Sequence, residues 1–434
     1  MGKNSSHLGR NVFIALIIGT IFGQLIRMEI NNQENLNQIY SYLNIISNVF
    51  LRLIKMIIAP LVFATLVSGI AKLSDIKSLG RMFYKSMIIF LIGGIIALSI
   101  GMIIVDYFEP GKSLSQVLLS SNSNLIPKNS NTILSSNLSL KKFIEDLVPE
   151  SVAAGFVHNH IIQVVIFAIF FGIAGVSLGE KTESVFNLFH KISLLFFRIT
   201  EYIMKLAPLA VFCAVSGVII NSGLAVISSY LIYVLEFILC IIILWALMLL
   251  LGYIILGKRI FVLLRMLASC IGIAFSTSSS ESVFPIVLEK LKEFGIKEET
   301  IGFVMPLGYS FNLVASMLNC SFATMFIIQL YGHTLSTTEK IIMLITLMVT
   351  SKGISGVPRV SLVIVASTLA SLGIPEAAVL ILFPIDGFLD MARSATNIFA
   401  NALATTFVNK WERNLEFKKP LNEINSISLD SDVI

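Results

Sequence analysis

Long apolar runs separated by short polar stretches dominate the sequence. Seven runs approach or exceed the roughly 20 residues that a membrane-spanning helix needs; they cover residues 11–26, 41–71, 86–105, 161–179, 206–235, 237–257 and 300–338. The last run contains no Asp, Glu, Lys or Arg and is longer than one crossing requires. The pattern predicts an all-helical, polytopic membrane protein whose first apolar segment is retained rather than cleaved.

Composition supports this class. Of 434 residues, 56% are hydrophobic and only 13% are charged, whereas soluble domains carry about 25% charged residues. Soluble globular, disordered and collagen-like chains are therefore excluded. The cysteines lie inside apolar runs and are interpreted as packing residues, which argues against a disulfide scaffold; they are Cys213, Cys240, Cys270 and Cys320.

The basic residues predict the orientation. Between successive apolar runs, twenty Lys and Arg fall on the side of the N-terminus and six on the opposite side. Basic residues collect on the cytoplasmic side of membrane proteins, so both termini are expected in the cytoplasm. The Ser- and Asn-rich residues 113–139 are expected to form an exposed loop, and the polar segment from Glu412 a tail.

Two polar interruptions break the apolar pattern of the C-terminal half. The first is the serine run 276–280 followed by Pro285, and the second is 350–358, TSKGISGVP. Either alone is equally well interpreted as a polar loop or tight turn. Together they favour two re-entrant helical hairpins that enter from opposite sides, because irregular backbone at membrane depth is tolerated only inside protein or water. Paired segments of this kind indicate a transporter's binding site, and helix N-termini there suit an anionic group.

The last apolar helix carries one polar stripe. Its members lie within roughly 80° of one another at about 100° per residue; they are Asp386, Asp390, Arg393, Asn397 and Asn401. Ionisable residues within a membrane are expensive and indicate function. The alternative is an internal Asp390–Arg393 ion pair that only joins helices. An aspartate and an arginine facing backbone donors match the ammonium and carboxylates of an acidic amino acid.

These motifs resemble the dicarboxylate/amino acid:cation symporter family, which has the glutamate transporter fold. The resemblance is carried by 276–285 (STSSSESVFP), 307–312 (LGYSFN), 351–358 (SKGISGVP), and 386–397 (DGFLDMARSATN) with 400–404 (ANALA). It is dense over 268–411 and is greatest to bacterial proton-coupled glutamate/aspartate symporters. It implies eight transmembrane helices plus two hairpins in an inverted repeat. Residues 1–258 then hold mainly helices one to six with a polar loop at 107–149, residues 259–411 the substrate-binding core, and residues 412–434 a cytoplasmic tail.

The resemblance also implies site roles. Asp390 is expected to hold the substrate amino group, Arg393 its side-chain carboxylate, and Ser394 with Asn397 its main-chain end. The two hairpin tips and the seventh helix complete the substrate site through Ser279, Ser280, Ser316, Val357 and Pro358. Relatives that carry C4-dicarboxylates lack the aspartate, so Asp390 favours glutamate or aspartate.

The resemblance implies a second set of residues as candidates for binding the coupling cation; these are Gly308, Asn312, Asp386, Asn397 and Asn401. Sodium-coupled members have a carboxylate where this chain has Val314, and another where it has Asn401. The third-helix residues that help to form the sodium site in those members correspond here to Phe90, Gly93 and Gly94. Sodium prefers hard oxygen ligands, so these departures point to H⁺ as the coupling ion, with Na⁺ still possible. Arg359, where a Gly is usual, either adds charge at the anion site or blocks it.

The proton carrier is left open. The glutamate that serves some relatives falls at Cys320, so Asp390, Asp386 and Glu281 are the candidates because burial raises a carboxylate's pKa. His158 and His160 are interpreted as interfacial residues. A homotrimer in the cytoplasmic (inner) membrane is implied by the family; no metal, organic cofactor or nucleic-acid partner is expected.

Three alternatives remain. The first keeps the fold but carries C4-dicarboxylates or cystine, or couples glutamate to sodium. The second is a serine hydrolase using residues 276–282, which is disfavoured because nucleophilic catalysis needs a base within hydrogen-bond reach and no His lies in that run. The third is a channel. The sequence therefore predicts a transporter, not an enzyme.

Overall fold

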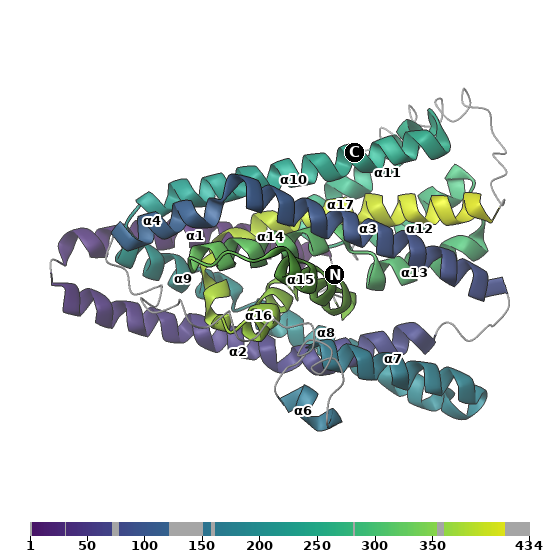
Figure 1. The fold of residues 1–434 in the computed structure, drawn as a ribbon, viewed down its shortest axis with the longest axis horizontal. Helices are drawn as coiled ribbons and strands as arrows, with labels where there is room; N and C mark the ends of the chain where they lie inside the picture. The colour runs from purple at the N-terminus through teal and green to yellow at the C-terminus, as the bar shows by residue number, and fades with distance from the viewer. Residues whose placement is uncertain are drawn as a thin grey trace.

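The computed structural model describes residues 2–30, 32–71, 78–120, 151–157, 161–280, 283–353 and 360–412, and these contain helices but no strand. The first part comprises α1 (Gly2–Glu29), α2 (Gln33–Ala71), α3 (Ser78–Phe108), α4 (Pro110–Ser120), α6 (Val152–Val157), α7 (Ile161–Leu178), the 3₁₀ helix η2 (Gly179–Thr182), α8 (Glu183–Met204), α9 (Ala207–Ser222) and α10 (Ala225–Leu256). The long helices run along one axis of an elongated bundle (Figure 1).

The second part consists of shorter elements. They are α11 (Arg259–Thr277), α12 (Phe284–Phe294), α13 (Glu298–Phe311), α14 (Val314–Leu330), α15 (Thr337–Thr350), η4 (Ser351–Gly353), α16 (Val360–Ser371), η5 (Glu376–Leu382) and α17 (Phe383–Trp411). The helices α11 and α12 contact each other across the serine run, and α15 contacts α16 across the second interruption. The two re-entrant hairpins stay a prediction, because residues 281–282 and 354–359 lie outside the described part.

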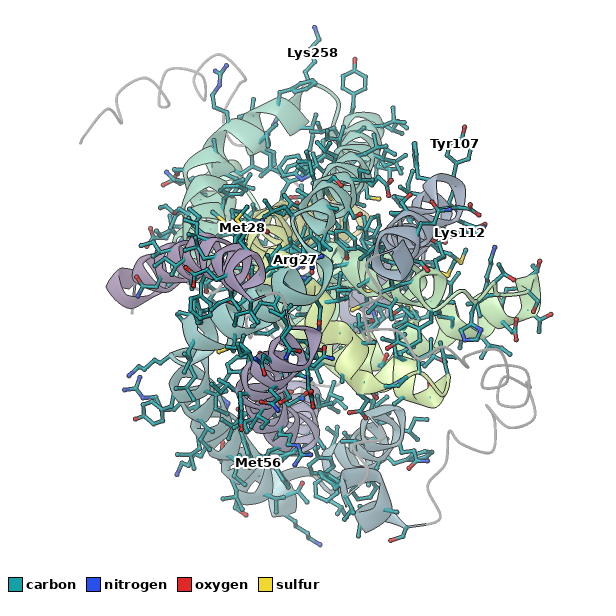
Figure 2. All side chains as sticks on the ribbon, turned by 90° about the vertical axis from the view of Figure 1, so that its left-hand side faces the viewer. Arg27, Met28, Met56, Tyr107, Lys112 and Lys258 are labelled. Carbon is teal, nitrogen blue, oxygen red and sulfur yellow. The ribbon has the colours of Figure 1, made fainter. Side chains whose placement is uncertain are left out.

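Length and hydropathy identify five helical segments able to cross a membrane among the described residues; these are Arg81–Phe108, Gln163–Thr200, Ala225–Leu256, Arg259–Thr277 and Glu298–Leu330. Several expose their apolar side chains. In an apolar stretch of 18 residues within Ala225–Leu256 only 22% of residues are buried, and Leu231 and Ile254 lie on the outer surface of this helix. Apolar surface of this extent suits lipid rather than water. End on, Tyr107 and Lys258 point away from the bundle (Figure 2).

The helix α14 forms the centre of the molecule. Every one of its residues is buried, which accounts for the charge-free sequence, because a helix that is apolar all round must be enclosed. It packs against α3, α4, α16 and α17. Close approach to α3 depends on Gly101, since a Cβ there would lie 2.6 Å from the carbonyl oxygen of Leu318.

Two sequence expectations about boundaries are wrong. The expected break at Glu236 lies instead at Gly223, whose φ of 75° ends α9, and α10 passes through Glu236 as one continuous helix. An isolated charge separates apolar runs in a sequence without ending a helix. The start of the expected 107–149 loop is also helical, because α4 covers Pro110–Ser120 and packs on α14; residues 121–150 lie outside the described part.

Candidate functional site

The polar stripe of α17 faces protein. All of its polar side chains are buried; they are Asp386, Asp390, Arg393, Ser394, Asn397 and Asn401. The neighbouring face of α17 is held by α10, where Trp245 stacks on Phe399 with 4.8 Å between ring centroids and donates from Nε1 to Thr396 Oγ1 at 2.9 Å. These contacts fix the rotation of α17 and keep its polar stripe turned inward.

Arg393 is the largest fully buried side chain of the described residues, with 1% exposure. Its guanidinium donates to Asp386 Oδ1 at 2.9 Å and to Asp390 Oδ1 at 2.7 Å. Asp386 lies in the first turn of α17, where the helix dipole also stabilises negative charge. Buried charges persist only when paired and hydrogen-bonded, and this cluster pairs one cation with two carboxylates.

The two ion pairs of the cluster lie within one helix. Arg393, Asp386 and Asp390 all belong to α17, so their ion pairs link neighbouring turns of a single helix. A buried ion pair is weak support for stability because desolvation offsets most of its attraction. Ionisable residues within a membrane are costly to bury and usually serve function.

A break between α13 and α14 faces the middle of this stripe. The helix α13 ends at Phe311, and Asn312 and Leu313 leave helical geometry. Asn397 binds the α14 side of the break, because its Oδ1 accepts from the amide of Ala315 at 3.0 Å and its Nδ2 donates to Ser316 Oγ at 3.2 Å. The amide oxygen thus lies at the positive N-terminal end of α14.

The cation candidates separate into two groups. Asn312 Nδ2 donates to Asn401 Oδ1 at 2.9 Å, and Gly308 lies against the same side chain, since a Cβ there would be 2.7 Å from that oxygen. Asn401 Nδ2 has no hydrogen-bond partner among the described residues. Asp386 precedes Asn401 by fifteen residues, or about 22 Å of helix, and bonds to Arg393 instead. These residues therefore do not surround one ion.

The first hairpin tip is placed against α13. Ser278 ends α11 in the left-handed conformation, Ser279 follows it, and the buried Ser280 accepts from Tyr309 Oη through its carbonyl at 3.1 Å. The second tip is not described, so the expectations for Val357 and Pro358 lie outside the described residues. The same holds for Glu281, Arg359, His158 and His160.

Three of the positions interpreted as departures from sodium-coupled members, Val314, Gly93 and Gly94, have apolar neighbours. Val314 is buried at the start of α14, and Gly93 of α3 lies beside it. The neighbouring Gly94 faces Met317. The part of the chain that the structure describes holds no group of three or more His, Cys, Asp or Glu side chains able to bind a metal ion. Val314 and the two glycines supply no side-chain oxygen, whereas Asn312 Oδ1 would lie 3.8 Å from a Cβ on Gly93.

The sequence predicts no role for two ionisable residues, Lys352 and Glu236. Lys352 belongs to the segment predicted to form the second hairpin tip. In the structure it lies in η4 and donates from Nζ to the carbonyl of Phe311 at 3.0 Å. Glu236 is buried in the middle of α10, and its Oε2 has no hydrogen-bond partner among the described residues. The sequence feature that could have identified Glu236 is a single charge between two apolar runs. Such a charge is an ionisable group within the membrane when the helix continues through it.

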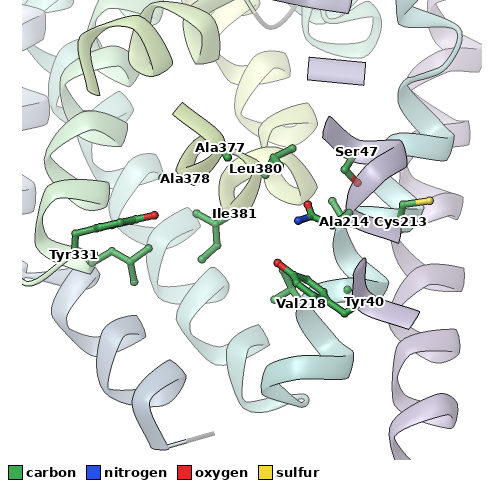
Figure 3. Close-up of a pocket in the computed structure, with 13 residues that line it drawn as sticks. Tyr40, Ser47, Cys213, Ala214, Val218, Tyr331, Ala377, Ala378, Leu380 and Ile381 are labelled. Atoms are coloured by element: carbon green, nitrogen blue, oxygen red, sulfur yellow. The ribbon is translucent and has the colours of Figure 1, made fainter. Parts of the chain in front are cut away.

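A cavity of about 140 Å³ lies elsewhere, between α2, α9, the end of α14 and η5. Tyr40 and Tyr331 enter it from opposite sides (Figure 3). Its lining contains none of the predicted site residues. The cavity is therefore separate from the Arg393 cluster.

Comparison with known proteins assigns the chain to a family. Residues 8–411 match the model of the sodium:dicarboxylate symporter family. The chain is 34% identical over 418 residues to the proton/glutamate-aspartate symporter of Escherichia coli K12, covering 95% of each protein. It is 35% identical over 415 residues to a proton/sodium-glutamate symport protein of Bacillus caldotenax, covering 93% of this chain and 94% of that protein.

A C4-dicarboxylate transport protein of Bacillus subtilis is 32% identical over 432 residues, with 98% of each protein covered. The similarity to these relatives spans both the N-terminal helices and the core that carries the Arg393 cluster. The chain is a polytopic helical membrane protein and belongs to the sodium:dicarboxylate symporter family.

Proposed function

We propose that this protein is a secondary active symporter that takes up glutamate and aspartate across the cytoplasmic membrane, coupled to protons. The observation that carries the proposal is the buried cluster of Arg393 with Asp390 and Asp386 beside the α13–α14 break. Arg393 offers a charge opposite to that of a substrate carboxylate, and Asp390 a charge opposite to that of the substrate ammonium. The named activities of the Escherichia coli and Bacillus caldotenax relatives support the same substrate class.

Binding proceeds by an exchange of partners. Arg393 presents its terminal nitrogens to the two aspartates, and a guanidinium can hold a carboxylate by two parallel hydrogen bonds. The side-chain carboxylate of the substrate displaces one aspartate from Arg393. Asp390 then pairs with the substrate ammonium, so that the aspartate released from Arg393 keeps a charged partner.

The remaining substrate groups meet polar atoms close by. The main-chain carboxylate is assigned to Ser394 and Asn397, with Ser316 holding the Asn397 amide in place. Ser279 and Ser280 close the site from the first tip, and Val357 with Pro358 from the second. Binding thus draws on both interruptions and on α17, the arrangement expected when broken helices form a midplane site.

Proton coupling is supported by the apolar replacement at Val314 and the neutral Asn401. Asp386, Asp390 and Glu281 are the candidate proton carriers, and Glu236 joins them because it is buried within a spanning helix. Gly308, Asn312 and Asn397 keep oxygen atoms near the break that a cation could use. Sodium coupling of glutamate uptake is the alternative. It is favoured by the name of the Bacillus caldotenax relative, a proton/sodium-glutamate symport protein.

The substrate-binding core is assigned to residues 259–411, with residues 1–258 mainly forming the surrounding helices and residues 412–434 a cytoplasmic tail. The distribution of basic residues supports a cytoplasmic location for both termini. We assign the functional form as a homotrimer by analogy with the family. No enzymatic role is proposed.

Competition for uptake separates the substrate classes. Purified protein in liposomes is expected to take up labelled glutamate, and unlabelled aspartate should compete at concentrations similar to those of unlabelled glutamate. Succinate and cystine should compete at least about tenfold more weakly, since neither presents one ammonium and two carboxylates in that spacing to Asp390 and Arg393. Succinate competing as well as glutamate would instead assign the C4-dicarboxylate activity of the Bacillus subtilis relative.

A further inference from the structure

The C-terminal end of α13 carries negative partial charge inside the protein. A helix leaves its last carbonyls without intrahelical partners, and their aligned dipoles favour cations there. Phe311 is the last residue of α13. The amide of Ala315, which would bond to Phe311 in an unbroken helix, donates to Asn397 instead. The Phe311 carbonyl is thereby available for a positive group.

Lys352 supplies that group. Its Nζ lies 3.0 Å from the Phe311 carbonyl oxygen and 3.8 Å from Met317 Sδ, so the ammonium spans the break from α13 to α14. The residue belongs to η4, which packs against α13 and α14 at the second hairpin. The lysine side chain therefore ties this hairpin to the broken helix through a charge.

The surroundings of Lys352 favour a fixed cation. The carbonyl that it binds carries the partial negative charge of a helix end. Val314, at the first turn of α14, is apolar and supplies no carboxylate that would neutralise a mobile metal cation. A site with a helix-end carbonyl and no carboxylate suits a cation that never leaves the protein.

We propose that the ammonium of Lys352 permanently occupies the position of a coupling cation at the α13–α14 break, which makes transport independent of sodium. The inference deepens the proposed symport function and rests on it for its physiological meaning. A tethered ammonium provides the charge that a bound Na⁺ would provide, and it closes the second hairpin on the broken helix without an ion from solution. Removing it should leave a carbonyl-lined position that a monovalent cation can enter.

The test compares Lys352→Met with the parent protein in sodium chloride and in choline chloride at equal ionic strength. Thermal unfolding of purified protein in detergent should be unaffected by sodium in the parent, whereas sodium should raise the unfolding temperature of Lys352→Met. Labelled glutamate uptake by Lys352→Met should rise on the order of tenfold with sodium, as expected for coupled sites. The parent should show a ratio near one.

Two controls define the interpretation. Lys352→Arg keeps the charge and should remain insensitive to sodium, and so should Lys340→Met, whose lysine pairs with the partly exposed Asp106 on the surface. Lys352→Gln provides a second neutral variant should Lys352→Met fold poorly. The proposal is overturned by neutral variants that do not respond to Na⁺, Li⁺ or K⁺, by variants that fold in neither salt, or by an equal sodium response of the parent. The unfolding measurement stands even if the protein transports no acidic amino acid.

Discussion

Replacing Arg393 with cysteine is expected to abolish uptake of acidic amino acids. Arg393 is the cation assigned to the substrate side-chain carboxylate, and it is fully buried, so no other part of the site can replace its two donors. Truncating one member of a buried, hydrogen-bonded charge pair costs about 2–5 kcal/mol, or between about 30-fold and about 4,000-fold in affinity. Labelled glutamate uptake into proteoliposomes measures the loss.

The same change also leaves Asp386 and Asp390 without their shared cation, which destabilises a buried site by about 3–5 kcal/mol. Combining Arg393→Cys with Asp386→Asn removes one of the two uncompensated charges and should restore folding without restoring glutamate uptake. Arg393→Lys keeps the charge but loses the two parallel N–H donors of the guanidinium, and should bind glutamate weakly. Glutamate uptake that persists in a folded Arg393→Cys protein removes the arginine from its assigned role.

Replacing Asp390 with asparagine is expected to change substrate class rather than to inactivate the protein. The assigned partner of Asp390 is the substrate ammonium, and asparagine keeps the shape of the side chain without its charge. Loss of this charge pair should weaken glutamate binding by about 2 kcal/mol or more, which lowers glutamate uptake at least roughly 30-fold. Competition by succinate should persist, because a C4-dicarboxylate brings no ammonium to the site. The measurement is uptake of labelled glutamate by Asp390→Asn and by the parent protein, with unlabelled glutamate or unlabelled succinate as the competitor.

Asp386→Asn is the matched control, since Asp386 bonds to the same guanidinium but is assigned no substrate group. It should keep the preference for glutamate over succinate. If Asp390→Asn and Asp386→Asn lower glutamate uptake equally and leave the preference unchanged, Asp390 supports Arg393 but does not read the amino group.

The sequence predicted the class of fold because burial in lipid and burial in protein leave different patterns. Apolar runs identified the long helices, and the charge-free run 300–338, longer than one crossing requires, contains α14 and most of α13. Two features were hidden. Glu236 looked like a boundary, although one charge does not end a helix that continues to hydrogen-bond. The helix α8 was missed because it carries polar residues at regular intervals, and apolar length alone does not detect such a helix.

For the site, periodicity placed the polar stripe of α17 on one face, and the structure buries that face as a unit. Asp386 was expected to act with Asn401, but its hydrogen bond to Arg393 depends on side-chain rotamers that spacing does not specify. Lys352 was visible in its motif, yet its contact with Phe311 joins residues 41 positions apart. Contacts between distant segments depend on tertiary packing and leave no local signal.

The most direct test of the central account measures accumulation of labelled glutamate in sodium-free proteoliposomes under an inward proton gradient. The account predicts uptake against the glutamate gradient that collapses when a protonophore dissipates the proton gradient, and that is lost in Arg393→Cys. Accumulation that requires sodium and does not respond to the proton gradient would contradict it.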